Sequence, residues 1–163
     1  MQKNRLNLVI DPWRIVEERF DPLQQQAAES LFALGNGVMG GRANFEERYS
    51  GPSLQGNYIG GVYYPDKTRV GWWKNGYPEY FAKVLNAAFW IGVDVWIDGE
   101  PLDLAAVEVK SFRREMDMRR SVLTRRMTVT MRNGAEVSVE SVRFLPLPHR
   151  ELGVVRYAVT PLN

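Results

Sequence analysis

The chain of 163 residues is long enough for one domain with its own hydrophobic core. It has no cysteine and a single histidine, which excludes a disulfide framework, thiolate chemistry and a metal site built from histidines. Its net charge of +2 is too small to indicate a nucleic-acid-binding protein, in which Lys and Arg are usually in large and concentrated excess.

The first forty residues predict short elements joined by turns. Residues 1–11 contain no long apolar stretch, so we expect neither a signal peptide nor a membrane helix, and a cytoplasmic protein is the expectation. Residues 13–20 are predicted as a strand. Helix propensity predicts a short helix over residues 24–34, which Gly35 and Gly37 would end.

The sequence Gly-Asn-Gly-Val-Met-Gly at residues 35–40 fits the G-x-G-x-x-G pattern of dinucleotide-binding loops. That loop binds a pyrophosphate only where a helix begins at its end, and residues 41–45 show no helical period. We therefore interpret the pattern as a tight turn whose small residues allow close backbone approach.

Two adjacent carboxylates, Glu46 and Glu47, follow this turn. Neighbouring residues on a strand point to opposite faces, whereas a catalytic pair must flank one glycosidic bond. A structural role is the favoured interpretation, with Arg42 or Arg48 as the expected ion-pair partner.

Residues 58–96 hold eleven of the nineteen aromatic residues. Trp90 and Trp96 lie in runs that resemble strands, which predicts core positions for both. Residues 67–76 instead indicate an exposed loop.

Within that loop Trp72 and Trp73 are adjacent, so at least one of them faces away from a core. Exposed apolar groups usually signal contact with a partner. Trp72, Trp73 and the nearby Tyr77 are therefore the candidate sugar-binding residues of this chain. Packing against another domain is the alternative for these three, and it is slightly favoured.

The second half of the chain carries the period-2 pattern of antiparallel strands. The hairpin signals Asp98-Gly99 and Asn133-Gly134 separate successive runs, and the second is expected to be a type I′ turn. Successive strands with tight turns predict an all-β, antiparallel β-sandwich. Strands are expected over residues 93–97, 106–118, 122–132, 135–144 and 152–160.

Three details of this half bear on function. Arg125 interrupts the apolar parity of its strand, which places it near a bend or a cleft. The parity of residues 135–144 flips near Ser141, which predicts a β-bulge. His149 lies beside two prolines and is interpreted as a solvated loop residue. The basic stretch comprises Arg113, Arg114, Arg119, Arg120, Arg125 and Arg126. Because acidic residues are interleaved with these arginines, we interpret the stretch as solvated strand faces.

Several stretches together resemble glycoside hydrolase family 65, the maltose, trehalose and kojibiose phosphorylases. The first is Glu-Ser-Leu-Phe-Ala-Leu-Gly-Asn-Gly at residues 29–37, followed by Gly40, Arg42 and Phe45-Glu46-Glu47. The later ones are Gly56–Tyr64, Tyr80–Trp90, Ile97–Leu102, Leu123–Arg125, Arg143-Phe144 and Arg156–Asn163. Their order and spacing carry the resemblance, which runs from about Trp13 to the end.

The resemblance implies an N-terminal super-sandwich of the galactose-mutarotase-like type, followed by an (α/α)6-barrel with the catalytic residues. It also implies reversible, inverting phosphorolysis of α-linked disaccharides, with inorganic phosphate as co-substrate and no cofactor. A Glu of the barrel protonates the leaving oxygen, and phosphate attacks from the opposite face.

The barrel and the remainder of the sandwich have no counterpart in residues 1–163. We therefore expect one domain, the front part of the N-terminal sandwich, with no catalytic residue, no metal site and no activity alone. The implied partners are the barrel of the parent chain, an α-linked disaccharide and a second copy in a homodimer. The alternatives are a standalone carbohydrate-binding module, a purely structural β-domain, or part of a trehalose hydrolase.

Overall fold

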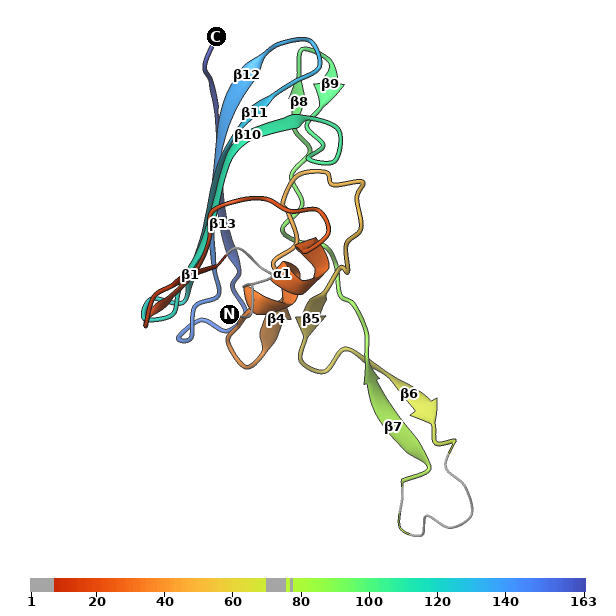
Figure 1. The fold of residues 1–163 in the computed structure, drawn as a ribbon. Coiled ribbons are helices and arrows are strands. Elements are labelled where there is room, and N and C mark those ends of the chain that lie inside the picture. The colour runs from red at the N-terminus through yellow and green to blue at the C-terminus, as the bar shows by residue number, and fades with distance from the viewer. Residues whose placement is uncertain (1–7, 70–75, 77) are drawn as a thin grey trace, which may run out of the picture.

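The computed structural model describes residues 8–69, 76 and 78–163. Its elements are mostly strands, with one short helix in the described ranges (Figure 1). In chain order they are β1 (Leu8–Ile10), β2 (Arg14–Glu17), α1 (Gln25–Leu31), β3 (Leu34–Gly35), β4 (Met39–Gly41), β5 (Asn57–Ile59), β6 (Tyr63–Lys67), β7 (Tyr80–Val84), β8 (Trp96–Ile97), β9 (Glu100–Pro101), β10 (Glu108–Asp117), β11 (Val122–Thr130), β12 (Glu136–Phe144) and β13 (Val154–Pro161).

The largest sheet of the described residues has the order β1-β2-β10-β11-β12-β13, and each of its pairs is antiparallel. The strands predicted over residues 106–118, 122–132, 135–144 and 152–160, together with the one over residues 13–20, lie in this sheet. The strand predicted over residues 93–97 is reduced to β8, which pairs with β9 in a separate hairpin. The predicted helix is α1, which ends at Leu31, before the glycines that were expected to end it. The mostly β, antiparallel fold is thus confirmed.

Two local predictions in the sheet are wrong. Strand β12 pairs with β11 in continuous register from Glu136 to Phe144, so there is no bulge at Ser141. The buried face simply changes from apolar to polar, since Ser141 and Arg143 follow Val139 on it. The turn at residues 133–134 is not type I′ either, because only Gly134 has a positive φ, of 89°.

The core lies on one face of this sheet, where residues 20–55 and 91–107 cover β10, β11 and β12. Its larger cluster is aromatic at the centre: the Phe45 and Phe112 rings lie 6.3 Å apart, and Phe20 packs against both. A smaller cluster joins Phe32, the residue that follows α1, to Leu123 of β11. Burying this apolar surface is the main force that holds the covering segments on the sheet.

Residues 35–40 form the turn between β3 and β4, as predicted, and not a nucleotide-binding loop. Gly37 has a φ of 86°, and the Asn36 side chain accepts the backbone N–H of Val38 and of Met39. The prediction that Trp96 is a core residue is wrong, because 63% of it is exposed at the β8–β9 hairpin. Trp90 is half-buried.

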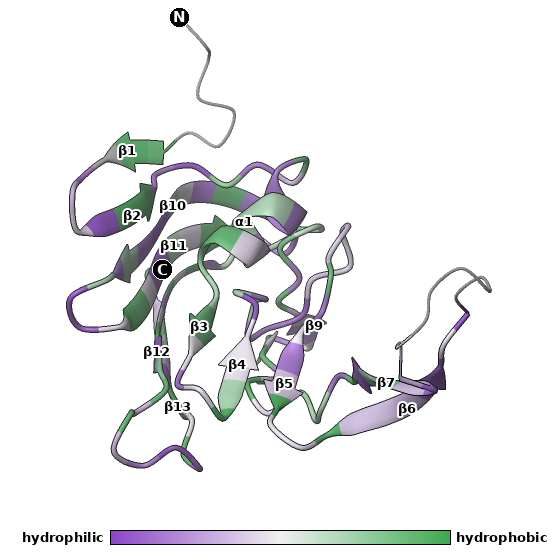
Figure 2. Ribbon diagram, turned by 90° about the horizontal axis from the view of Figure 1, so that it is seen from below, coloured by the Kyte–Doolittle hydropathy of each residue, from purple (hydrophilic) through white to green (hydrophobic). Residues whose placement is uncertain are grey.

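Strands β6 and β7 form a hairpin that projects away from the large sheet (Figures 1 and 2). We call residues 62–68 and 78–85 the arm. Every residue of β6 and β7 is exposed except Asp66, which is half-buried. An isolated two-stranded hairpin is marginally stable in water, so an arm of this kind gains stability from whatever packs against it.

Among the described residues, no helix has the length and apolar character needed to cross a membrane.

Candidate functional site

The candidate sugar-binding residues Trp72, Trp73 and Tyr77 lie outside the described residues. In the sequence they fall between β6 and β7. Their role stays a prediction.

The described part of the arm is itself an exposed apolar surface. Tyr63 and Tyr64 are 57% and 58% exposed, and Val84 is 62% exposed. Tyr80 and Phe81 add two more exposed rings from the opposite strand. Apolar groups gathered on a projecting element usually mark a contact surface with another domain or protein.

A buried network of charges lies beside the core. Its central residue is Arg125 of β11, and this residue is 3% exposed. Its guanidinium donates to both carboxylate oxygens of Glu47, each at 2.5 Å, and to Oε2 of Glu46 at 2.8 Å. The Tyr157 hydroxyl of β13 donates to Glu47 Oε2 at 3.0 Å. Arg143 of β12 lies with its Nε 3.5 Å from Glu46 Oε1.

The prediction that Glu46 and Glu47 pair with Arg42 or Arg48 is therefore wrong. The two glutamates lie in a bend, so their side chains converge on one cation and do not point to opposite faces. Arg48 pairs instead with Asp103, at 3.4 Å. Arg125 was expected near a bend or a cleft; β11 is paired in continuous register there, and the side chain lies in this buried cluster.

A second buried ion pair joins Arg114 of β10 to Glu17 of β2, with Nη2 and Oε2 2.7 Å apart. Arg114 also donates to Gln25 of α1, and Gln25 donates to Glu29. The basic stretch is thus only partly solvated: Arg114 and Arg125 are buried, whereas Arg119, Arg120 and Arg126 are exposed. His149 is exposed, as predicted.

The network shifts the pKa of Glu46 and that of Tyr157. Burial alone would raise the pKa of Glu46, but the charges of Arg125 and Arg143 outweigh it and hold that pKa below the ordinary value. Burial and the neighbouring Glu47 carboxylate raise the pKa of the Tyr157 hydroxyl. Neither glutamate is free to act as a general acid or base, because both are bound to a guanidinium.

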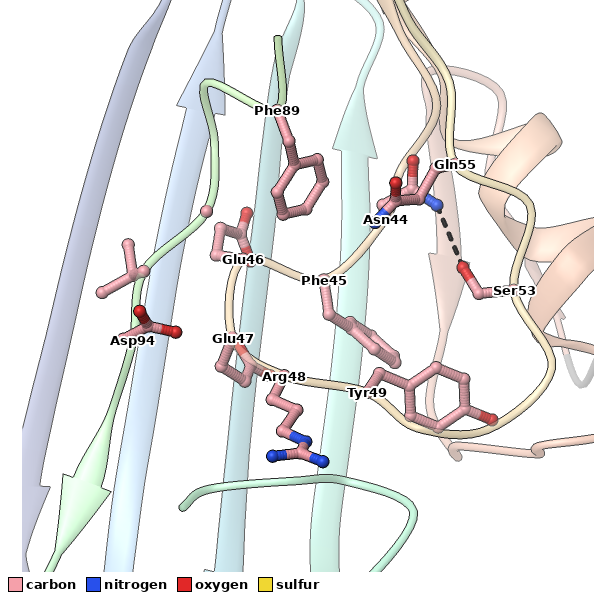
Figure 3. Close-up of a pocket in the computed structure, with 12 residues that line it drawn as sticks. Asn44, Phe45, Glu46, Glu47, Arg48, Tyr49, Ser53, Gln55, Phe89 and Asp94 are labelled. Atoms are coloured by element: carbon pink, nitrogen blue, oxygen red, sulfur yellow. Dashed lines mark hydrogen bonds between the residues drawn. The ribbon is translucent and has the colours of Figure 1, made fainter. Parts of the chain in front are cut away.

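A cleft of about 440 Å³ opens beside this network. One wall is the loop of residues 44–55, and the other is the segment of residues 89–94 (Figure 3). The Phe89 ring lines the cleft, and the residue is 38% exposed. The exposed side chains of Gln55 and Asp94 lie on opposite walls. We call this the Phe89 cleft.

Hydrogen bonds from the network hold both walls in place. The carbonyl of Glu46 accepts the backbone N–H of Val93 at 2.8 Å. Glu29 of α1 accepts the Ser53 hydroxyl at 2.5 Å and the Leu54 N–H at 2.8 Å. The cleft is therefore preformed. Within the described ranges no group of His, Asp or Glu side chains is arranged to hold a metal ion.

Sequence reasoning missed the Phe89 cleft and the partners of the buried arginines. Hydrogen-bonded pairs such as Arg114 and Glu17 are 97 residues apart, and no local pattern connects them. The only available signal was the charge at an apolar position of β11.

Residues 15–163 match the family described as "Glycosyl hydrolase family 65, N-terminal domain". The chain is 47% identical to a maltose phosphorylase of Bacillus subtilis over 91% of this chain and 19% of the relative. It is 31% identical to an alpha,alpha-trehalose phosphorylase of Thermoanaerobacter brockii, over 94% of this chain and 20% of the relative.

A solved structure agrees with these relatives. It is a putative kojibiose phosphorylase from the human microbiome, with a TM-score of 0.86 and 29% identity. The match covers 96% of this chain and 21% of that one, so this chain spans about a fifth of the length of the proteins it matches. The chain belongs to glycosyl hydrolase family 65, of which it is an N-terminal domain.

Proposed function

We propose that this chain serves as a non-catalytic N-terminal domain of an inverting α-glucoside phosphorylase-like enzyme, and that it supports a catalytic barrel. The observation that carries the proposal is the arm, which presents exposed aromatic rings on both faces. Such a surface fits a contact with another domain better than it fits open solvent.

The remaining expectations fit the same role. Residues 1–163 would form one domain, the front part of an antiparallel super-sandwich, with open strand edges at β1 and β13 where further strands can pair. Trp72, Trp73 and Tyr77 would lie where the arm meets the barrel, a second copy in a homodimer, or the disaccharide. Inorganic phosphate would be the co-substrate of the whole enzyme, which we expect in the cytoplasm.

The buried network supports a scaffold role over a catalytic one. Each of its carboxylates, Glu17, Glu46 and Glu47, is bound to an arginine, and all three are buried. A general acid has to reach the leaving oxygen of its substrate, and these carboxylates are enclosed by their partners. We therefore assign no catalytic residue to this chain.

A chimera tests the proposal. In the Bacillus subtilis maltose phosphorylase, the matched segment is replaced by this chain, to which it is 47% identical. We expect the chimera to cleave maltose only with phosphate, and this chain alone to cleave nothing. Phosphate-independent cleavage of trehalose would instead favour the hydrolase alternative. A folded but inactive chimera would argue against the proposal.

Variants of the arm test the contact itself. The double variant Tyr64→Ser, Phe81→Ser removes two exposed rings and should lower both the thermal stability and the activity of the chimera. Leu147→Ser is the control, because Leu147 is an exposed apolar residue, 66% accessible, outside the arm. Equal effects of the two changes would contradict a contact at the arm.

A further inference from the structure

The Phe89 cleft has no part in the role proposed above. Its volume of about 440 Å³ lies within the range of small-molecule sites, roughly 300–1,000 Å³. We propose that it binds a neutral saccharide, one hexose unit of an α-glucoside, as an accessory site on this domain.

Free hydrogen-bonding groups line the cleft. Among the described residues, the side chains of Asp94 and Gln55 make no hydrogen bond or ion pair and are exposed. Asp94 offers only acceptors, and the Gln55 amide offers both donors and an acceptor. Arg48 contacts Asp103 through its Nε, and its side chain is 62% exposed, so its terminal nitrogens can donate into the cleft. Sugar hydroxyls both donate and accept, which matches this mixture.

An aromatic ring supplies the apolar part of the site. One face of a pyranose ring is a flat array of C–H groups, and it buries apolar surface when it stacks on an aromatic side chain. Phe89 is 38% exposed and its ring lines the cleft (Figure 3), so it is available for such a contact.

Gly92 positions this ring. A Cβ at Gly92 would lie 2.8 Å from Cδ1 of Phe89 and 3.0 Å from Cε1, closer than carbon atoms pack. The backbone N–H of Gly92 also donates to the Phe89 carbonyl at 3.3 Å, which closes the turn. The absence of a side chain at Gly92 therefore lets the Phe89 ring lie against the wall of the cleft.

The charges of the site favour a neutral ligand over an anion. Glu46 and Glu47 belong to the lining, but Arg125 and Arg143 beneath them balance their charges. The lining also contains one exposed carboxylate, Asp94, and one exposed guanidinium, Arg48, so the charges of the lining include both signs. A phosphate ion would meet Asp94 without a buried cation of its own to bind, because each buried guanidinium already contacts a glutamate.

The test is a titration of the whole chain with glucose, maltose, kojibiose and trehalose, followed by amide chemical shifts. We expect saturable shifts at residues 44–55 and 89–94 with at least one sugar. Phe89→Ala should weaken binding about tenfold, equivalent to about 1.4 kcal/mol. Gly92→Ala should also weaken it, because it displaces the ring, and Phe89→Tyr should retain it.

Two controls distinguish sugar binding in the Phe89 cleft from binding at the arm and from a response to phosphate. Tyr64→Ala, in the arm, should leave the affinity unchanged, and inorganic phosphate should not shift residues 89–94. Binding that survives Phe89→Ala, shifts confined to the arm, or shifts with phosphate alone would each overturn the proposal, as would the absence of any shift. This readout is independent of the chimera's activity, so either proposal can fail while the other stands.

Discussion

Replacing Arg125 with methionine tests whether the buried network holds the domain together. The guanidinium is 3% exposed and makes three hydrogen bonds to two buried carboxylates. After its removal Glu46 keeps Arg143, at 3.5 Å, but Glu47 keeps only the Tyr157 hydroxyl. At least one buried carboxylate is then left without a cation.

The expected loss follows from that unpaired charge. Removing one partner of a buried ion pair typically costs about 3–5 kcal/mol, because the remaining charge is not solvated. Domains of this kind are stable by roughly 5–15 kcal/mol, so Arg125→Met should remove a large part of the free energy of unfolding. Methionine nearly fills the space of the arginine stem, which keeps the cavity contribution small.

Urea unfolding followed by circular dichroism measures this loss, with Arg126→Met as the matched control. Arg126 is the next residue of β11, but it is 66% exposed where it pairs with Glu140, at 2.6 Å. Exposed pairs contribute about 0–1 kcal/mol. The double variant Arg125→Met, Glu47→Met should recover stability, because the unpaired carboxylate is gone. If Arg125→Met costs no more than Arg126→Met, the network does not carry the stability assigned to it.

Three further perturbations follow from the structure. The arginines lower the folded-state pKa of Glu46 against the effect of burial, so its ionised form stabilises the fold above pH 4.5. That stability is lost as the pH falls through the lowered pKa. In an acid titration, Glu46→Gln should therefore lose folding stability less steeply than the unchanged chain. Phe112→Ala should cost about 3–5 kcal/mol in urea unfolding, because the ring is 5% exposed and lies 5.5 Å from the Phe20 ring, and a cost below 1 kcal/mol would contradict a packed centre. Gly134→Ala should cost about 1 kcal/mol because its φ is 89°, whereas Gly35→Ala, at a residue without positive φ and with only an ordinary contact at 3.6 Å, should cost less in the same assay.

The parts of the fold that were predictable are those where side-chain period and turn residues agree. Strand β11 is an example: its apolar residues share one parity from Leu123 to Met131, and Asn133-Gly134 ends the hairpin. The type of that turn was not predictable from the dipeptide alone. Gly134 N–H donates to Met131 O, and Gly134 alone takes positive φ, which is the three-residue loop with a glycine bulge.

A two-residue period predicts a strand only where one of its faces is apolar and buried. The elements that could not be predicted do not meet this condition. In β12 the buried positions are apolar up to Val139 and polar at Ser141 and Arg143. In the sequence this looks like a change of the buried parity, although the strand is paired regularly. In the arm both faces are exposed, so the sequence has no alternation to detect. The two-residue strand at Trp96 is too short for parity to decide which side chain is buried.

The polar face of β11 and β12 also explains how an open cleft can be rigid. The loop of residues 44–55 packs Phe45 and Tyr49 against the core, and its polar groups add hydrogen bonds to that packing. Here Glu46 binds Arg125 through its carboxylate and Val93 through its carbonyl, so one residue ties the sheet to both walls. Because these hydrogen bonds shape the cleft before a ligand enters, binding requires less ordering.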